Sequence, residues 1–185
     1  MSTIRVLGIS GSLRAKSTNT GLLRYAQAHA PQGMSIEIAD LSQIPFYNQD
    51  LTEKPEAVKT LLQQIAQADA LLLACPEYNY SLAPALKNAL DWASREPNNA
   101  ALAGKATAIL GSGGGMGTSR AQYHLRQVCV YVDLRPLNKP EVFCNAFANT
   151  FDADSNLVDS HVQGLIREQL SALKLWAEQL RKLRK

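Results

Sequence analysis

Cysteine is scarce in this sequence of 185 residues, and the spacing of the three cysteines matches no disulfide or metal-binding pattern. Cys75, Cys129 and Cys144 lie far apart along the chain and include no C-x-x-C spacing. Neither a disulfide scaffold nor a zinc site is therefore expected, and we predict no metal site. A reducing compartment, the cytoplasm, is the predicted location.

Long hydrophobic runs are also absent. No stretch approaches the ~18 uninterrupted apolar residues that a transmembrane helix needs. The triplet Ala28-His29-Ala30 imitates a signal-peptide cleavage site, but Arg14, Lys16 and Arg24 interrupt the segment where the apolar core of a signal peptide would lie. We therefore expect no membrane association and a mature chain that starts near Met1.

The sequence has little excess of charge of one sign. Its net charge of +3 comes from 19 basic against 16 acidic residues. Four of the basic residues stand close to the end of the chain: Arg181, Lys182, Arg184 and Lys185. The body of the chain is therefore close to neutral, whereas a nucleic-acid-binding fold carries a basic face. No nucleic-acid partner is expected, and the basic tail is interpreted as the solvated C-terminus of a helix.

The composition is that of an ordinary globular protein, with 46% hydrophobic and 19% charged residues. At this length roughly 70% of the surface of the unfolded chain can be buried. The sequence therefore predicts a single domain over residues 1–185 that needs neither disulfides nor a structural metal.

Short apolar runs alternate with amphipathic segments along the whole chain. The runs predict strands at 4–10, 35–40, 70–75 and 105–110, and a fifth within 133–143, which Pro136 and Pro140 interrupt. Between them, apolar residues at helical spacing predict helices at 19–30, 55–65, 84–92, 119–130 and 159–183. This alternation is typical of an α/β fold with one doubly wound, five-stranded parallel sheet.

Ligands of such sheets bind beyond the carboxyl ends of the strands. Three loops, after Ile9, after Cys75 and after Leu110, are therefore the places to look for chemistry.

The first loop is rich in hydrogen-bond donors and lies between a buried strand and a helix N-terminus. Its candidate phosphate-binding residues are Ser10, Ser12, Arg14, Ser17, Thr18 and Asn19. The alternative is that Ser17 or Thr18 only caps the helix. The loop matches neither a Walker A motif nor a nucleophile elbow, and G-x-G-x-x-G is missing here and after Leu110.

The second loop combines flat and polar side chains at the end of the most apolar strand. Its candidates are Pro76, Glu77, Tyr78, Asn79 and Tyr80, which offer an apolar surface and an amide to a planar polar ring. An equally open alternative is that the tyrosines pack and Asn79 forms a turn.

The third loop is a glycine cluster over residues 111–117. Without side chains, the backbone of Ser112, Gly113 and Gly114 could approach a ligand and direct its N–H groups at it. The alternative is a flexible linker.

In combination, these motifs closely resemble those of the NADPH-dependent FMN reductase family, and most nearly its bacterial quinone and chromate reductases. The matching segments are Gly11-Ser12-Leu13-Arg14 with Ser17 and Asn19, residues 76–81 with 86–92, and the glycine loop with residues 120–126. The resemblance implies a flavodoxin-like fold with strand order 2-1-3-4-5 and FMN as cofactor. By the same resemblance, the first loop would hold the FMN phosphate, residues 77–80 would line the isoalloxazine, and residues 112–114 would close over its pyrimidine end.

The function implied by this resemblance is FMN-dependent transfer of hydride from NADPH or NADH to small acceptors. Quinones are the first candidates for the acceptor, and chromate, free flavin and azo compounds are further candidates. The flavin would carry the chemistry, so no catalytic side chain is predicted. The alternative is a flavodoxin-type electron carrier without substrate chemistry. Such carriers are usually strongly acidic, and the net charge of +3 argues against one.

The resemblance further implies a homo-oligomer built from dimers, a homodimer or a homotetramer. We hypothesise that Arg120 and Tyr123 meet Glu141 at a subunit contact beside the flavin. The alternative is that this helix face is simply solvated.

Overall fold

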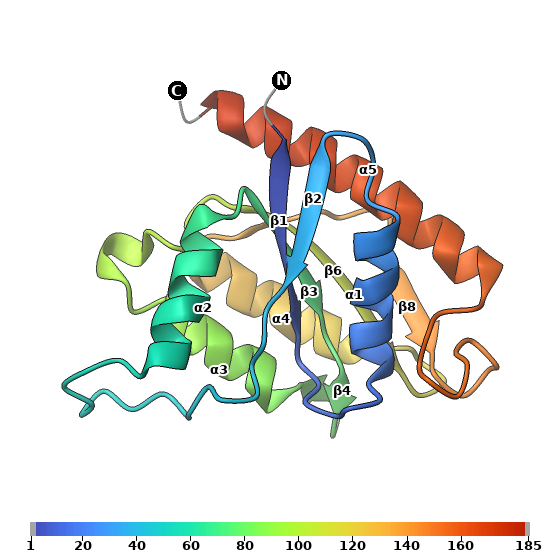
Figure 1. The fold of residues 1–185 in the computed structure, drawn as a ribbon, viewed down its shortest axis with the longest axis horizontal. Coiled ribbons are helices and arrows are strands. Elements are labelled where there is room, and N and C mark those ends of the chain that lie inside the picture. The colour runs from blue at the N-terminus through green and yellow to red at the C-terminus, as the bar shows by residue number, and fades with distance from the viewer. Residues whose placement is uncertain (1–2, 184–185) are drawn as a thin grey trace.

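The computed structural model describes residues 3–183 and contains an α/β fold around one six-stranded parallel sheet (Figure 1). The sheet order is β2-β1-β3-β6-β7, and β8 also pairs with β6. The strands are β1 (Ile4–Ser10), β2 (Met34–Ile38), β3 (Ala70–Ala74), β6 (Ala106–Gly113), β7 (Arg135–Pro136) and β8 (Val142–Asn145). A separate antiparallel hairpin is formed by β4 (Glu77–Tyr78) and β5 (Ser81–Leu82).

Helices cover both faces of the sheet. One face packs against α1 (Thr18–Ala28) and α5 (Ser160–Leu183), and the other against α2 (Glu56–Gln67), α3 (Pro84–Ala93) and α4 (Ser119–Tyr131). A short 3-10 helix, η1 (Pro97–Asn99), follows α3. Side chains of a strand alternate between the two cores, so that Leu71 and Leu73 of β3 enter one core and Leu72 the other. This two-sided burial is why the strands are continuous apolar runs.

The predicted count of five strands is wrong at the last strand. The segment expected to form one strand forms two, β7 and β8, and both pair with β6. Proline cannot donate to a strand ladder; Pro136 is the last residue of β7, and Pro140 lies between β7 and β8. The observed order therefore departs from the predicted 2-1-3-4-5 at its far edge.

The glycine loop begins later than expected. Gly111, Ser112 and Gly113 continue β6, because β8 lies beside them and pairs with them at Phe143, Cys144 and Asn145. The linker alternative is therefore wrong for these three residues.

The C-terminal helix ends in basic residues, as expected. Arg181 is not merely solvated, since its guanidinium lies 2.7 Å from the Asp69 carboxylate. Arg184 and Lys185 lie outside the described residues, as does Met1. Within residues 3–183 no helix combines the length and hydropathy that crossing a membrane would require.

Candidate functional site

The carboxyl ends of β1, β3 and β6 meet at one edge of the sheet, which is the lower edge in Figure 1, beside β4. A pocket of about 510 Å³ opens there, which we call the three-loop pocket. It is lined by Ser12, Arg14, Ser17, Thr18, Asn19, Pro76, Glu77, Tyr78, Ser112, Gly113, Gly114, Ala146 and Phe147. The fold thus brings together most residues of the three loops that the sequence singles out.

The first loop presents the N-terminus of α1 to this pocket. Ser17 is the N-cap, and its Oγ accepts a hydrogen bond of 3.2 Å from the backbone N–H of Thr20. Ser17 therefore caps α1 and also lines the pocket. The N–H groups of Thr18 and Asn19 come too early in the helix to bond within it. With the exposed guanidinium of Arg14 nearby, they make this end of the pocket suited to an anion.

Ser10 stabilises the first loop and does not line the three-loop pocket. Its Oγ accepts a hydrogen bond of 3.0 Å from Thr20 Oγ1 and one of 3.2 Å from the backbone N–H of Ser12. These bonds hold the first turn of the loop against α1. Ser10 does not line the three-loop pocket, because it lies within β1 and its hydroxyl is used by the loop itself.

Asn19 joins the first loop to the third. Its Nδ2 donates to the carbonyl of Ser112 over 2.8 Å, and its Oδ1 accepts from the backbone N–H of Ser112 over 3.0 Å. The Ser112 N–H is therefore committed to a side chain, which corrects the expectation that it points at a ligand. Both residues are buried, so this reciprocal pair sets the spacing of the two loops.

Glu77 caps a helix from outside it. Its Oε2 accepts hydrogen bonds of 3.2 Å from the backbone N–H groups of Arg120 and Ala121 at the start of α4, where Thr118 makes no side-chain cap. Its Oε1 binds the Arg120 guanidinium, with Nε at 2.6 Å. This hydrogen bond raises the pKa of Arg120. Glu77 is the one acidic residue among those lining the pocket, so its pairing leaves the Arg14 charge uncompensated there.

Asn79 and Tyr80 form the turn of the β4–β5 hairpin. Their φ angles are 49° and 69°, as a two-residue turn of this hand requires. The turn alternative therefore holds for Asn79. Tyr80 points outward, 67% exposed, with the Arg120 guanidinium 3.7 Å above its ring. Neither residue is among those that line the pocket.

The glycines of the third loop have two roles. A Cβ on Gly111 would overlap the Thr118 hydroxyl and the Cys75 carbonyl, so this glycine permits close packing. A Cβ on Gly114 or Gly115 would meet nothing within 4 Å. Gly114 lines the pocket, so the space beside its Cα is open there.

Sequence reasoning missed Ala146 and Phe147, which follow β8 and line the pocket. Phe147 is 85% exposed. The sequence does contain a signal for them. The fifth predicted strand is parallel to the others, so its carboxyl end lies at the same edge of the sheet, and the residues after it are also candidates for the pocket. The predicted strand ends at residue 143, whereas β8 continues to Asn145, and the loop that follows reaches the pocket.

Two residues of the hypothesised subunit contact, Arg120 and Glu141, form ion pairs within the chain. Arg120 binds Glu77, and the Glu141 carboxylate binds Lys139 Nζ. Tyr123 is 66% exposed on α4. Contact between copies at these residues stays a prediction.

The three-loop pocket fits FMN in its chemistry. One end offers hydroxyls, a helix N-terminus and Arg14 to a dianionic phosphate. The rest of the lining offers Pro76, the ring of Tyr78 and the glycine backbone to a planar ring. The Ser112 hydroxyl is buried beside the pocket and makes no hydrogen bond of normal geometry among the described residues.

Comparison with known proteins agrees with this fit. Residues 4–149 match the model of the family described as NADPH-dependent FMN reductase. An NAD(P)H-dependent FMN reductase of Pseudomonas aeruginosa is 55% identical, over 96% of this chain and 97% of its own length. An NADPH:quinone oxidoreductase of Arabidopsis thaliana is 45% identical, over 96% and 93%.

Among solved structures, the flavoenzyme FerB of Paracoccus denitrificans, an NAD(P)H:(acceptor) oxidoreductase, superposes with a TM-score of 0.86 at 30% identity. The match covers 96% of this chain and 98% of FerB. Since the family match spans most of the chain and includes all three pocket loops, the chain belongs to the NADPH-dependent FMN reductase family.

Proposed function

We propose that the protein is an FMN-dependent NAD(P)H oxidoreductase that reduces quinones. In the overall reaction, NAD(P)H and one proton convert a quinone to its hydroquinone, so that two electrons and two hydrogens are transferred. The observation that carries the proposal is the three-loop pocket, which combines anion-binding groups with Pro76, Tyr78 and glycine backbone in one cavity of about 510 Å³. The relatives that bear reductase and quinone oxidoreductase names support the same reaction.

In this proposal, one set of pocket residues binds the phosphate of the cofactor and another set contacts its ring. Ser12, Arg14 and Thr18 would bind the phosphate, and Pro76, Tyr78 and the Gly113–Gly114 backbone would contact the ring. Ser17, Asn19 and Glu77 would act as positioning residues, because their side chains already cap helices or join loops. The chemistry that bound FMN supplies is two-electron exchange between the nicotinamide and the acceptor. The chain contributes binding, orientation and the positive potential of Arg14.

The proposal has a direct test. The purified protein should carry or take up FMN with a yellow absorbance spectrum, and it should oxidise NADPH when 1,4-benzoquinone is added. NADH is tested beside NADPH, and chromate, free flavin and an azo dye serve as further acceptors. Stopped-flow mixing with NADPH separates this function from that of a flavodoxin-type carrier. A flavin that binds but is not reduced by either nucleotide would contradict the proposal.

We also propose a homodimer or homotetramer in a reducing cytoplasm. Exposed aromatic side chains support association between copies, among them Tyr80, Tyr123 and Tyr131. The free state of Cys75, Cys129 and Cys144, all buried, supports the compartment.

A further inference from the structure

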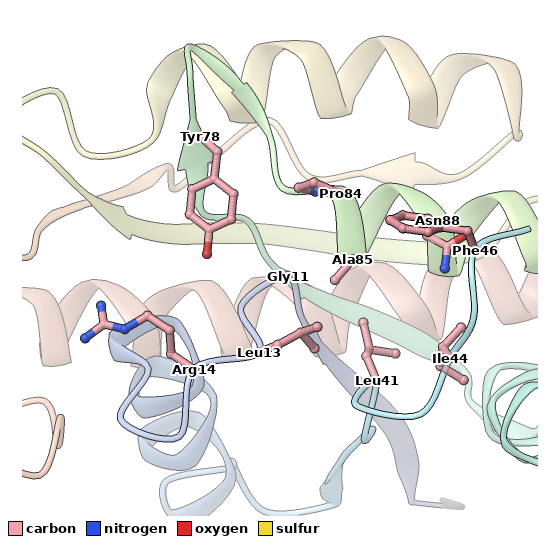
Figure 2. Close-up of a pocket in the computed structure, with 10 residues that line it drawn as sticks. All are labelled: Gly11, Leu13, Arg14, Leu41, Ile44, Phe46, Tyr78, Pro84, Ala85 and Asn88. Atoms are coloured by element: carbon pink, nitrogen blue, oxygen red, sulfur yellow. The ribbon is translucent and has the colours of Figure 1, made fainter.

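A second cavity of about 520 Å³ adjoins the three-loop pocket, and we call it the side cavity (Figure 2). Its lining is mostly apolar: Gly11, Leu13, Arg14, Leu41, Ile44, Phe46, Tyr78, Pro84, Ala85 and Asn88. Arg14 and Tyr78 also line the three-loop pocket, so the two cavities share a wall. In Figure 2 these two residues stand at one end of the side cavity, and Phe46 and Asn88 at the other.

The outer wall of the side cavity is held in place by hydrogen bonds. Asn88 Nδ2 and Trp92 Nε1, both on α3, each donate to the Pro45 carbonyl over 2.8 Å. Asn88 Oδ1 accepts from the backbone N–H of Tyr47 over 2.8 Å. The loop that carries Ile44 and Phe46 is thereby fixed to α3, so the cavity is preformed.

The chemistry of the lining selects the ligand. Arg14 is the single charged residue of the lining, and it lies at the shared end. The Asn88 amide is already engaged on both its oxygen and its nitrogen. Two apolar residues of the lining are exposed to water: Leu13 is 60% exposed and Phe46 is 78% exposed. A cavity with this lining favours a hydrocarbon group and gives no support to the phosphates of a dinucleotide.

We propose that the side cavity binds the hydrocarbon substituent of the acceptor, an alkyl or prenyl chain on a quinone ring. This inference rests on the proposed function, since the ring must lie beside the cofactor for electron transfer. Because Arg14 and Tyr78 line both cavities, one molecule can place its ring at these two residues, beside the cofactor in the three-loop pocket, and its chain along Leu13 toward Phe46. The preferred acceptor is thus an alkylated quinone rather than a bare one.

Binding is measured without turnover. The FMN-loaded protein is titrated calorimetrically with 1,4-hydroquinones that carry chains of about one to five carbons. Burial of each methylene should tighten binding about fourfold. Ala85→Phe fills the cavity and should flatten this series, and Phe46→Ala removes its far wall and should weaken the trend. Leu175→Ala, which removes an exposed apolar side chain of α5 outside both cavities, serves as the control and should keep the trend.

A flat series in the wild type, or an undiminished trend in both cavity variants, would overturn the inference. A Phe46→Ala protein that dissociates in sedimentation would also overturn it, since the exposed rim would then be a contact between copies. NADPH oxidation with 1,4-benzoquinone is followed in parallel. It tests the proposed function separately, because this small acceptor has no chain.

Discussion

At the scale of single residues, charge at the anion-binding end is the feature that matters most. Arg14 is exposed and lines the three-loop pocket, and no carboxylate of the pocket wall compensates it. Arg14→Ala should therefore weaken FMN binding by about 1.5–3 kcal/mol, through loss of a charge-assisted hydrogen bond to phosphate. Fluorescence titration measures this change. Lys16→Ala removes a nearby cation that pairs with Asp154 instead, and it should leave FMN binding almost unchanged.

Riboflavin provides the internal control for this prediction. It lacks the phosphate, so it should bind the wild type and Arg14→Ala alike. If riboflavin binding falls as far as FMN binding, Arg14 does not hold the phosphate.

Glu77 acts at the same scale through the backbone of α4. Glu77→Ala leaves the N–H groups of Arg120 and Ala121 without their acceptor, and loss of such a cap costs about 0.5–2 kcal/mol. Glu77→Gln keeps one carbonyl oxygen for these N–H groups and should lose less. Urea unfolding followed by circular dichroism gives the free energies. Glu56→Gln changes an exposed acid at the start of α2 and should alter stability least. Equal losses in all three variants would exclude the capping role.

At the scale of elements, β6 packs closely against Thr118 and Cys75 because Gly111 has no side chain. Gly111→Ala places a Cβ against the Thr118 hydroxyl and the backbone carbonyl of Cys75, which cannot both move aside. Such overpacking costs about 1–3 kcal/mol. The matched control is Gly115→Ala, whose Cβ meets open space. Thermal unfolding should separate the two variants, and similar midpoints would show that β6 tolerates the added carbon.

At the scale of the whole molecule, the buried thiols make stability depend on alkaline pH. Burial raises the pKa of Cys75 and of Cys129 to about 12, and that of Cys144 to about 11. In the unfolded chain the same thiols ionise near their ordinary value of 9.0. The unfolded state therefore releases protons first, and stability is lost as the pH rises from about 9 toward 11–12.

Urea unfolding at about pH 7.5 and about pH 10 measures this loss. The loss is expected at a pH above the pKa of the thiols in the unfolded chain. The free energy of unfolding should be lower at the higher pH. Cys129→Ala removes one of the three thiols, so its difference between the two pH values should be smaller, whatever its stability at neutral pH. A difference as large as that of the wild type would mean that other groups cause the loss.

Much of this protein can be predicted from its sequence, because the relevant signals are local. Leu71, Leu72 and Leu73 predict a strand buried on both faces, and Pro84 predicts the start of α3. The alternation of strands and helices then places the loops after Ile9, Cys75 and Leu110 at one edge of the sheet, since carboxyl ends of parallel strands share an edge. The composition of the first loop predicts an anion site there.

The sequence by itself therefore determined the fold class, the edge of the sheet that carries the pocket and most of the residues that line it. Only the tertiary structure decided what each side chain does there. Asn19 and Glu77 carry the expected polar groups, yet their partners are Ser112 and Arg120, which lie 93 and 43 positions further along the chain. The register of β8 on β6, which extends β6 through the glycines, likewise depends on contacts distant in sequence. Local preferences cannot specify such partners, because they are chosen by packing between segments that meet only in the folded chain.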